Sequence, residues 1–276
     1  MSEPVILING QPATTLSVAD RGLQYGDGLF ETIPFRHGKL EYLDAHIERL
    51  LRGCSRLQID FTDLALLQHE LVTLCAQTAQ DAVIKIMITR GSGGRGYKPP
   101  LDALPQRIIA SHPLPDYPAH YSEGVTVQLC SIRLSSNPLL AGIKHLNRLE
   151  QVLARNEWST DVIAEGLMLD YQDRLVEGTM SNLFLVKDEH LLTPNLNESG
   201  IEGIMRQRVI ELASVLNIPT EITTLNMDDL YQADEVFLTN SLINIWPVTA
   251  LSGTNKTWSH GAITQRLQKA LSTTDN

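Results

Sequence analysis

A proline-rich break near the middle of the chain constrains its fold more than any other feature. The segment SHPLPDYPAHYSEG, residues 111–124, contains three prolines and shows neither helical nor strand periodicity. Because proline fixes φ and offers no backbone N–H donor, such a segment is typical of a connection between folded parts. We therefore predict two domains, residues 1–112 and 125–276, joined by a linker at 113–124. A chain of 276 residues is long enough to bury two cores.

The part before the break alternates short strands with two helices. The runs LFETIPF and KLEYL flank His37-Gly38, which indicates a β-hairpin. Apolar residues recur at helical spacing over residues 44–57, with Asp44 as the expected N-cap, and a second helix is expected over residues 63–78. These patterns predict a small α+β domain.

The part after the break contains more strands than helices. Short apolar runs such as GLMLDY, RLVEG and NLFLV indicate strands, and helices are expected over residues 203–216 and 261–271. We expect a larger mixed α/β domain with a partly antiparallel sheet. A further helix is expected within residues 139–158, where one apolar stripe is formed by Leu146, Leu149, Val152 and Leu153.

Lys144 precedes this stripe and falls in the expected first helical turn. A lysine on the polar side of a helix is usually a solvated charge. However, the positive end of the helix dipole, a backbone approach permitted by Gly142 and the nearby charge of Arg148 would all favour a neutral amine. A neutral lysine can form a Schiff base or act as a base. This segment alone leaves both interpretations open.

Charge and cysteine content narrow the functional classes. The formal net charge is -10, and no run of Lys and Arg forms a basic segment within the chain. Both observations argue against non-specific nucleic-acid binding. Cys54, Cys75 and Cys130 lack metal-ligand spacing, so we expect free thiols and no metal site. We find no signal peptide and no segment long enough to span a bilayer, so we expect a cytoplasmic protein with no membrane partner.

Four further segments could carry chemistry, each with an ordinary alternative. Glu177 ends an expected strand and could hold a proton on a heteroaromatic nitrogen, although acids beside glycine are common in turns. Gly203 precedes a helix whose N–H groups could bind an anion, or is a simple junction. Residues 239–241 could bind phosphate or only end a strand. The loop TRGSGGRGYKPP, residues 89–100, suits carboxylate recognition at least as well as a nucleotide.

The order of these segments resembles a known family. DRGLQYGDGLFET, HIERL, RGSGGRGY, GIKHLNRLEQVLARN, EGTMSNLF, GIMR and TNSLINIWPV follow one another along nearly the whole chain. Together they resemble the fold-type IV pyridoxal phosphate enzymes. The resemblance implies a two-domain α/β (α+β) fold, pyridoxal 5'-phosphate as cofactor and a homodimer.

Roles in cofactor binding follow from the resemblance position by position. Lys144 matches the lysine that forms a Schiff base with the cofactor and moves protons, and Glu177 matches the carboxylate paired with the pyridine nitrogen. Arg49 matches the arginine that binds the phosphate. The remaining phosphate-binding positions are Ile204, Met205, Asn240 and Ser241.

Roles in substrate binding are also implied. Arg95 and Tyr97 of the glycine-rich loop match substrate-carboxylate positions, and Arg148 could supply a second cation for a dicarboxylate. Phe30 and Thr32 are candidates for the substrate pocket, and Thr32 for proton handling, without an assigned role. The preceding Glu31 gives the pair Phe-Glu, which is also common in transaminase members.

Within the family, RGSGGRGY and NPLLAGIKHLNRLEQVLAR look most like the lyases that convert aminodeoxychorismate to p-aminobenzoate and pyruvate for folate synthesis. This resemblance also implies a functional link to aminodeoxychorismate synthase. A transaminase acting on D-amino acids or branched-chain amino acids is the closest alternative. A binding protein that has lost the chemistry, and a nucleotide-binding protein built around GSGGRG, are weaker ones.

Overall fold

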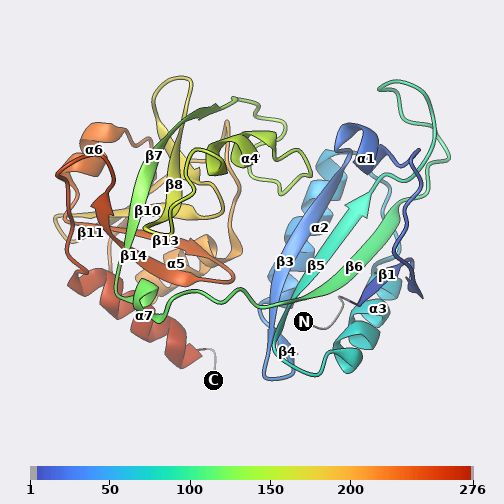
Figure 1. Ribbon diagram of the computed structural model, residues 1–276, viewed down its shortest axis with the longest axis horizontal. Coiled ribbons are helices and arrows are strands. Elements are labelled where there is room, and N and C mark those ends of the chain that lie inside the picture. The colour runs from blue at the N-terminus through green and yellow to red at the C-terminus, as the bar shows by residue number, and fades with distance from the viewer. Residues whose placement is uncertain (1–4, 275–276) are drawn as a thin grey trace. The chain divides into compact units, whose positions relative to one another are not determined.

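The computed structural model describes residues 5–274, which divide into two compact units (Figure 1). The first comprises the chain up to Asp116 together with Ile143–Asn147, and the second comprises Tyr117–Gly142 and the chain from Arg148 onward. The change at Asp116 lies within residues 113–124. The return of 143–147 to the first unit was not foreseen from the sequence.

The first unit is built on a six-stranded antiparallel sheet with the order β2-β1-β6-β5-β3-β4. Its strands are β1 (Ile6–Ile8), β2 (Gln11–Pro12), β3 (Gly28–Arg36), β4 (Lys39–Leu40), β5 (Ala82–Thr89) and β6 (Gln106–Pro113). The hairpin predicted at His37-Gly38 is confirmed, because both residues adopt positive φ and β3 pairs with β4.

Helices α2 (Leu43–Arg56) and α3 (Leu64–Gln77) pack on β3 and β6 respectively, and both lie behind the sheet in Figure 1. A short helix, α1 (Arg21–Tyr25), precedes β3. The N-cap predicted at Asp44 is wrong. Tyr42 occupies the cap position with φ 52°, so Asp44 lies inside the first turn. At this position the carboxylate of Asp44 still interacts favourably with the positive end of the helix dipole.

The second unit is built on an eight-stranded sheet with the order β12-β11-β10-β13-β14-β7-β8-β9. Its strands are β7 (Val125–Leu134), β8 (Ile163–Asp170), β9 (Leu175–Gly178), β10 (Asn182–Lys187), β11 (His190–Pro194), β12 (Thr220–Thr223), β13 (Glu235–Asn240) and β14 (Asn244–Leu251). The pairs β7–β8, β14–β7 and β11–β12 are parallel and the others antiparallel. Because β9 also pairs with β10, six of the strands close into a ring around an apolar core.

Helices surround this sheet, with bounds α4 (Leu149–Arg155), α5 (Ile204–Val215), α6 (Met227–Gln232), α7 (Ala262–Thr274) and the 3-10 helix η1 (Ala119–Ser122). The helices predicted over 203–216 and 261–271 are confirmed as α5 and α7. The short α6, which begins with a capping box at Asn226, was not predicted. No helix within residues 5–274 is long and apolar enough to cross a membrane.

The apolar stripe predicted for the helix after Lys144 does not form a buried face. Leu149, Val152 and Leu153 are 76%, 53% and 55% exposed, whereas Ala154 is fully buried. Ala154 packs with Cys130 in the cluster beside β7 and β8. A small residue permits close packing there, so the side of α4 that faces the protein is not the apolar stripe that helical periodicity identified.

Candidate active site

Lys144 lies in an irregular segment that pairs with β3. The N–H of Phe30 donates to the carbonyl of Lys144 at 2.9 Å, and the N–H of Leu146 donates to Gly28 at 3.0 Å. These bonds occupy backbone groups that a helix would use, and α4 begins only at Leu149. The prediction that Lys144 sits in a first helical turn is therefore wrong, and so is the helix-dipole argument for its neutral amine.

The side chain of Lys144 lies against a second predicted site residue. Its Nζ atom is 4.5 Å from the centroid of the Phe30 ring, and the Nζ of Lys85 lies 5.5 Å from the same centroid. The structure thus brings Lys144 and Phe30 together within the first unit. Thr32, two residues further along β3, is partly buried.

Arg49 belongs to a buried charged cluster on α2 and β3. Its Nε and Nη2 atoms donate to the two oxygens of Glu31 at 2.9 and 2.6 Å, and Nδ1 of His46 lies 2.6 Å from the same carboxylate. Burial opposes ionisation of Glu31, but the Arg49 charge and these hydrogen bonds outweigh it and lower the pKa to about 2. Burial lowers the pKa of His46, so a neutral ring donating to Glu31 fits the geometry.

Arg95 and Tyr97 lie in the exposed loop between β5 and β6. Tyr97 is 86% exposed, and Arg95 is also exposed to solvent. Tyr97 contacts the ring of Tyr25 edge-on, at 5.6 Å between centroids. The loop therefore exposes both side chains to solvent, and their part in substrate binding stays a prediction.

Glu177 is a buried carboxylate at the end region of β9. It is 4% exposed, and its Oε2 accepts the N–H of Ile201 at 2.8 Å. Burial lowers the pKa of Arg148, while the negative charge of Glu177 opposes that effect. Glu177 and Arg148 thus lie near enough in the second unit for their charges to interact.

The N-terminus of α5 lies next to Glu177. Ile204 and Met205 are the first residues of this helix, and Gly203 before them provides no capping side chain. The side-chain amide of Asn182 donates to the carbonyl of Ile201 at 2.8 Å. A Cβ atom on Gly203 would lie only 2.0 Å from the side-chain oxygen of Asn182, so this position has no room for a side chain. Backbone N–H groups at such a helix start can bind an anion.

Asn240 and Ser241 lie where β13 turns toward β14. Both ends of the Asn240 amide make internal bonds, because Oδ1 accepts the N–H groups of Leu242 and Ile243 and Nδ2 donates to the carbonyl of Met180. Asn240 thereby shapes this turn. Ser241 is partly buried beside it.

The sequence matches the family described as Amino-transferase class IV over residues 28–251. The chain belongs to this family. It is 40% identical over 272 residues to an aminodeoxychorismate lyase of Vibrio harveyi, covering 96% of this chain and 99% of that protein. It is 31% identical over 277 residues to a D-alanine aminotransferase of Staphylococcus aureus, covering 96% and 95%.

The fold agrees with membership of the class IV family. A crystal structure of 4-amino-4-deoxychorismate lyase from Pseudomonas aeruginosa matches with a TM-score of 0.93 and 49% identity, covering 96% of this chain and 97% of that chain. The resemblance stated from the sequence motifs and the two-domain fold class are confirmed.

Sequence reasoning did not single out Glu165, a buried acid beside the predicted site residue Asn240 in this class IV chain. Glu165 on β8 is 1% exposed and accepts hydrogen bonds from the turn after β9, namely from Thr179, Met180 and Ser181. Since the Met180 carbonyl binds Asn240, Glu165 fixes the turn that holds the Asn240 amide. The sequence feature that could have indicated Glu165 is its position as a single acid within the apolar run IAEGLML, residues 163–169.

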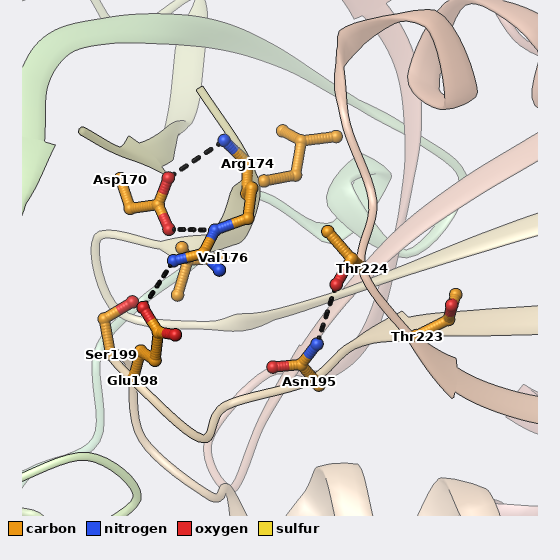
Figure 2. A pocket seen from close by; sticks show the side chains of 9 residues that line it. Asp170, Arg174, Val176, Asn195, Glu198, Ser199, Thr223 and Thr224 are labelled. Atoms are coloured by element: carbon orange, nitrogen blue, oxygen red, sulfur yellow. Dashed lines mark hydrogen bonds and ion pairs between the residues drawn. The ribbon is translucent and has the colours of Figure 1, made fainter. Parts of the chain in front are cut away.

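A hollow elsewhere in the second unit is not a ligand site. Figure 2 shows Arg174 between Asp170 and Glu198. Arg174 donates to these two carboxylates at 2.6 and 2.7 Å, and the Asn195 amide donates to Thr224 at 2.9 Å. Its volume is about 10 Å³, which is room for about one water molecule. This network is structural, and it includes none of the predicted site residues.

Proposed function

We propose that the chain is a pyridoxal phosphate-dependent 4-amino-4-deoxychorismate lyase, which forms p-aminobenzoate and pyruvate. The observation that carries this proposal is the similarity to the Pseudomonas aeruginosa lyase, at 49% identity over nearly the whole of both chains. The Staphylococcus aureus aminotransferase shares the family at a lower identity of 31%.

The donor groups of the described residues fit this cofactor. Lys144 would bond to its aldehyde carbon, and the buried carboxylate of Glu177 would hold a proton on its pyridine nitrogen. Arg49 and the uncapped helix start at Ile204 and Met205 would bind its phosphate. Because both ends of the Asn240 amide bind within the chain, we assign Asn240 to shaping this site, with Ser241 beside it.

The reaction assigns a distinct task to each residue. When bound, the cofactor supplies an electron sink for the carbon–hydrogen bond broken at the amino-bearing carbon. The Lys144 amine takes that proton. The electron pair left on the carbon expels the neighbouring enolpyruvyl oxygen, so the carbon–oxygen bond breaks and the ring becomes aromatic. The enolpyruvyl group departs as an enolate, which takes up one proton on carbon to give pyruvate, and no keto acid is consumed.

Substrate recognition requires cations for two carboxylates. We assign Arg95 and Tyr97 to one of them and Arg148 to the other, with Phe30 and Thr32 as pocket residues. The proximity of Phe30 to the Lys144 amine supports a place beside the reacting atoms. Arg148 is a cation, because a guanidinium keeps its proton in proteins. Burial lowers the pKa of Arg148, and the negative charge of Glu177 opposes that effect.

Incubation of the cofactor-loaded protein with aminodeoxychorismate, without a keto acid, tests the proposed function. We expect p-aminobenzoate and pyruvate to form in equal amounts, as measured by chromatography and a coupled lactate dehydrogenase assay. A parallel incubation with D-alanine or branched-chain amino acids and a keto acid tests the transaminase alternative. Amino transfer without p-aminobenzoate would refute the lyase and leave the family and cofactor intact.

Replacing Glu177 with Gln should slow the reaction without releasing the cofactor. Glutamine keeps the size of the side chain and an oxygen for the Ile201 N–H, but it cannot stabilise a proton on the pyridine nitrogen. We expect kcat to fall by about 10²-fold, with cofactor content, measured after alkaline release, unchanged. Glu211→Gln on the exposed part of α5 is the matched control. A wild-type rate in Glu177→Gln would remove Glu177 from the mechanism.

The homodimer, the cytoplasmic location and the functional link to a synthase remain predictions. For the homodimer, the relevant feature of the described chain is the exposed apolar face of α4, formed by Leu149, Val152 and Leu153. Apolar side chains gathered on one helix face are typical of surfaces that a partner covers.

A further inference from the structure

One buried arginine binds the middle of the glycine-rich loop. The Arg21 side chain is 3% exposed and points all three of its nitrogen groups at acceptors. Its Nη1 and Nη2 atoms donate to the carbonyls of Gly96 and Tyr97 at 3.0 and 2.9 Å, and its Nε donates to Asp27 at 3.0 Å. Arg21 therefore binds the backbone of Gly96 and Tyr97, the two residues that follow Arg95.

The surroundings of Arg21 hold it in a single orientation. Asp27 also binds Arg90, whose other bonds reach the carbonyls of Leu57 and Gln58 at the end of α2. The guanidinium lies 4.8 Å from the Tyr25 ring centroid. A planar guanidinium with paired acceptors loses little further freedom when it binds the loop, so Arg21 is preorganised for this contact.

The middle of the loop is rich in glycine, whereas its start at Arg90 is tied to Asp27, Leu57 and Gln58. Gly94 and Gly96 adopt φ values of +77° and +72°, which residues with a side chain rarely adopt. Because glycine loses more backbone conformational entropy than other residues when it is ordered, this part of the loop is costly to hold in one conformation. The side chains of Arg95 and Tyr97 are exposed and bury little surface. The two bonds from Arg21 hold the backbone at Gly96 and Tyr97, where the Tyr97 ring also contacts Tyr25.

We propose that Arg21 is a positioning residue for substrate recognition: it fixes the loop so that Arg95 and Tyr97 are presented in a binding-competent arrangement. Arg21 does not contact the substrate in this proposal. The role of Arg95 and Tyr97 in this inference rests on the proposed function. That Arg21 holds the loop follows from its hydrogen bonds to Gly96 and Tyr97 alone.

Arg21→Lys and Arg21→Met separate this role from a merely structural one. Lysine can keep one charged contact to Asp27 but cannot reach two carbonyls in a fork, and methionine keeps only the apolar stem. For the cofactor-loaded enzyme we expect KM for aminodeoxychorismate to rise about tenfold or more in Arg21→Met and less in Arg21→Lys, with kcat within about threefold of wild type. Cofactor content should not change.

Trypsin provides a readout that does not depend on activity. Cleavage after Arg95 requires the loop to open locally, so both Arg21 variants should be cut there at least about fivefold faster than wild type, as followed by mass spectrometry. Arg107→Met is the matched control, because it removes another buried arginine of the first unit, which binds Asp63 and Glu70 instead of the loop. Circular dichroism on each variant checks that the fold persists.

The outcomes discriminate between the two levels of the inference. Faster cleavage after Arg95 with a raised KM supports the proposal, and an unchanged KM overturns the role in substrate recognition. Cleavage no faster than in Arg107→Met overturns the proposed contact between Arg21 and the loop. If the wild type forms no p-aminobenzoate, the proposed function fails, and trypsin still decides whether Arg21 holds the loop.

Discussion

Lys144→Ala should lower the formation of p-aminobenzoate by at least about 10³-fold. Alanine has no amine to bond to the cofactor aldehyde carbon or to take the proton from the substrate. Borohydride reduction of the cofactor-loaded wild type should leave the cofactor attached to the chain, as an increase in intact mass. The same treatment of Lys144→Ala should give no increase.

Lys85 provides a matched control for this experiment. Its amine approaches the Phe30 ring to 5.5 Å, against 4.5 Å for Lys144, and both lysines belong to the first unit. Lys85→Ala should therefore still retain the cofactor after reduction. If Lys144→Ala retains it and Lys85→Ala does not, the cofactor lysine has been assigned wrongly.

Local chemistry explains which elements the sequence could predict. The hairpin at His37-Gly38 depends on residues that tolerate positive φ, and α5 depends on helical spacing after Gly203. Both signals lie within a few residues of the structure they determine. The candidate site was likewise identified from short motifs, such as those around Lys144 and Glu177, through a family resemblance rather than through spacing.

Long-range contacts explain what the sequence could not predict. Segment 143–147 leaves the helix pattern because its backbone pairs with Gly28 and Phe30, more than a hundred positions earlier. The exposure of the apolar face of α4 could not be predicted either, because periodicity does not show which side of a helix packs against the protein. In the structure that side is the one that carries Ala154. No spacing in the sequence indicates the bonds of Arg21 to the loop, although Arg21 lies in the segment DRGLQYGDGLFET.

Arg49→Met should destabilise the cofactor-free protein by about 3–5 kcal/mol. The substitution leaves the Glu31 carboxylate, which is 1% exposed, without the two hydrogen bonds and the charge that Arg49 supplies. Urea unfolding measures this change. Arg52→Met on the same helix is the matched control, because Arg52 pairs with Glu48 at 3.9 Å on the surface and such pairs contribute less than about 1 kcal/mol.

The pH dependence of the Arg49→Met effect tests whether the Glu31 charge causes it. The pKa of Glu31 is about 2 in the folded protein, against an ordinary value of 4.5. Ionised Glu31 therefore stabilises the fold fully above about pH 4.5, and this contribution is lost as the pH falls through about 2. In Arg49→Met the carboxyl can protonate instead of remaining a buried, poorly compensated charge. The stability difference from wild type should therefore be largest near neutral pH and shrink below about pH 4.5, whereas a constant difference would assign the effect to lost packing of the arginine stem.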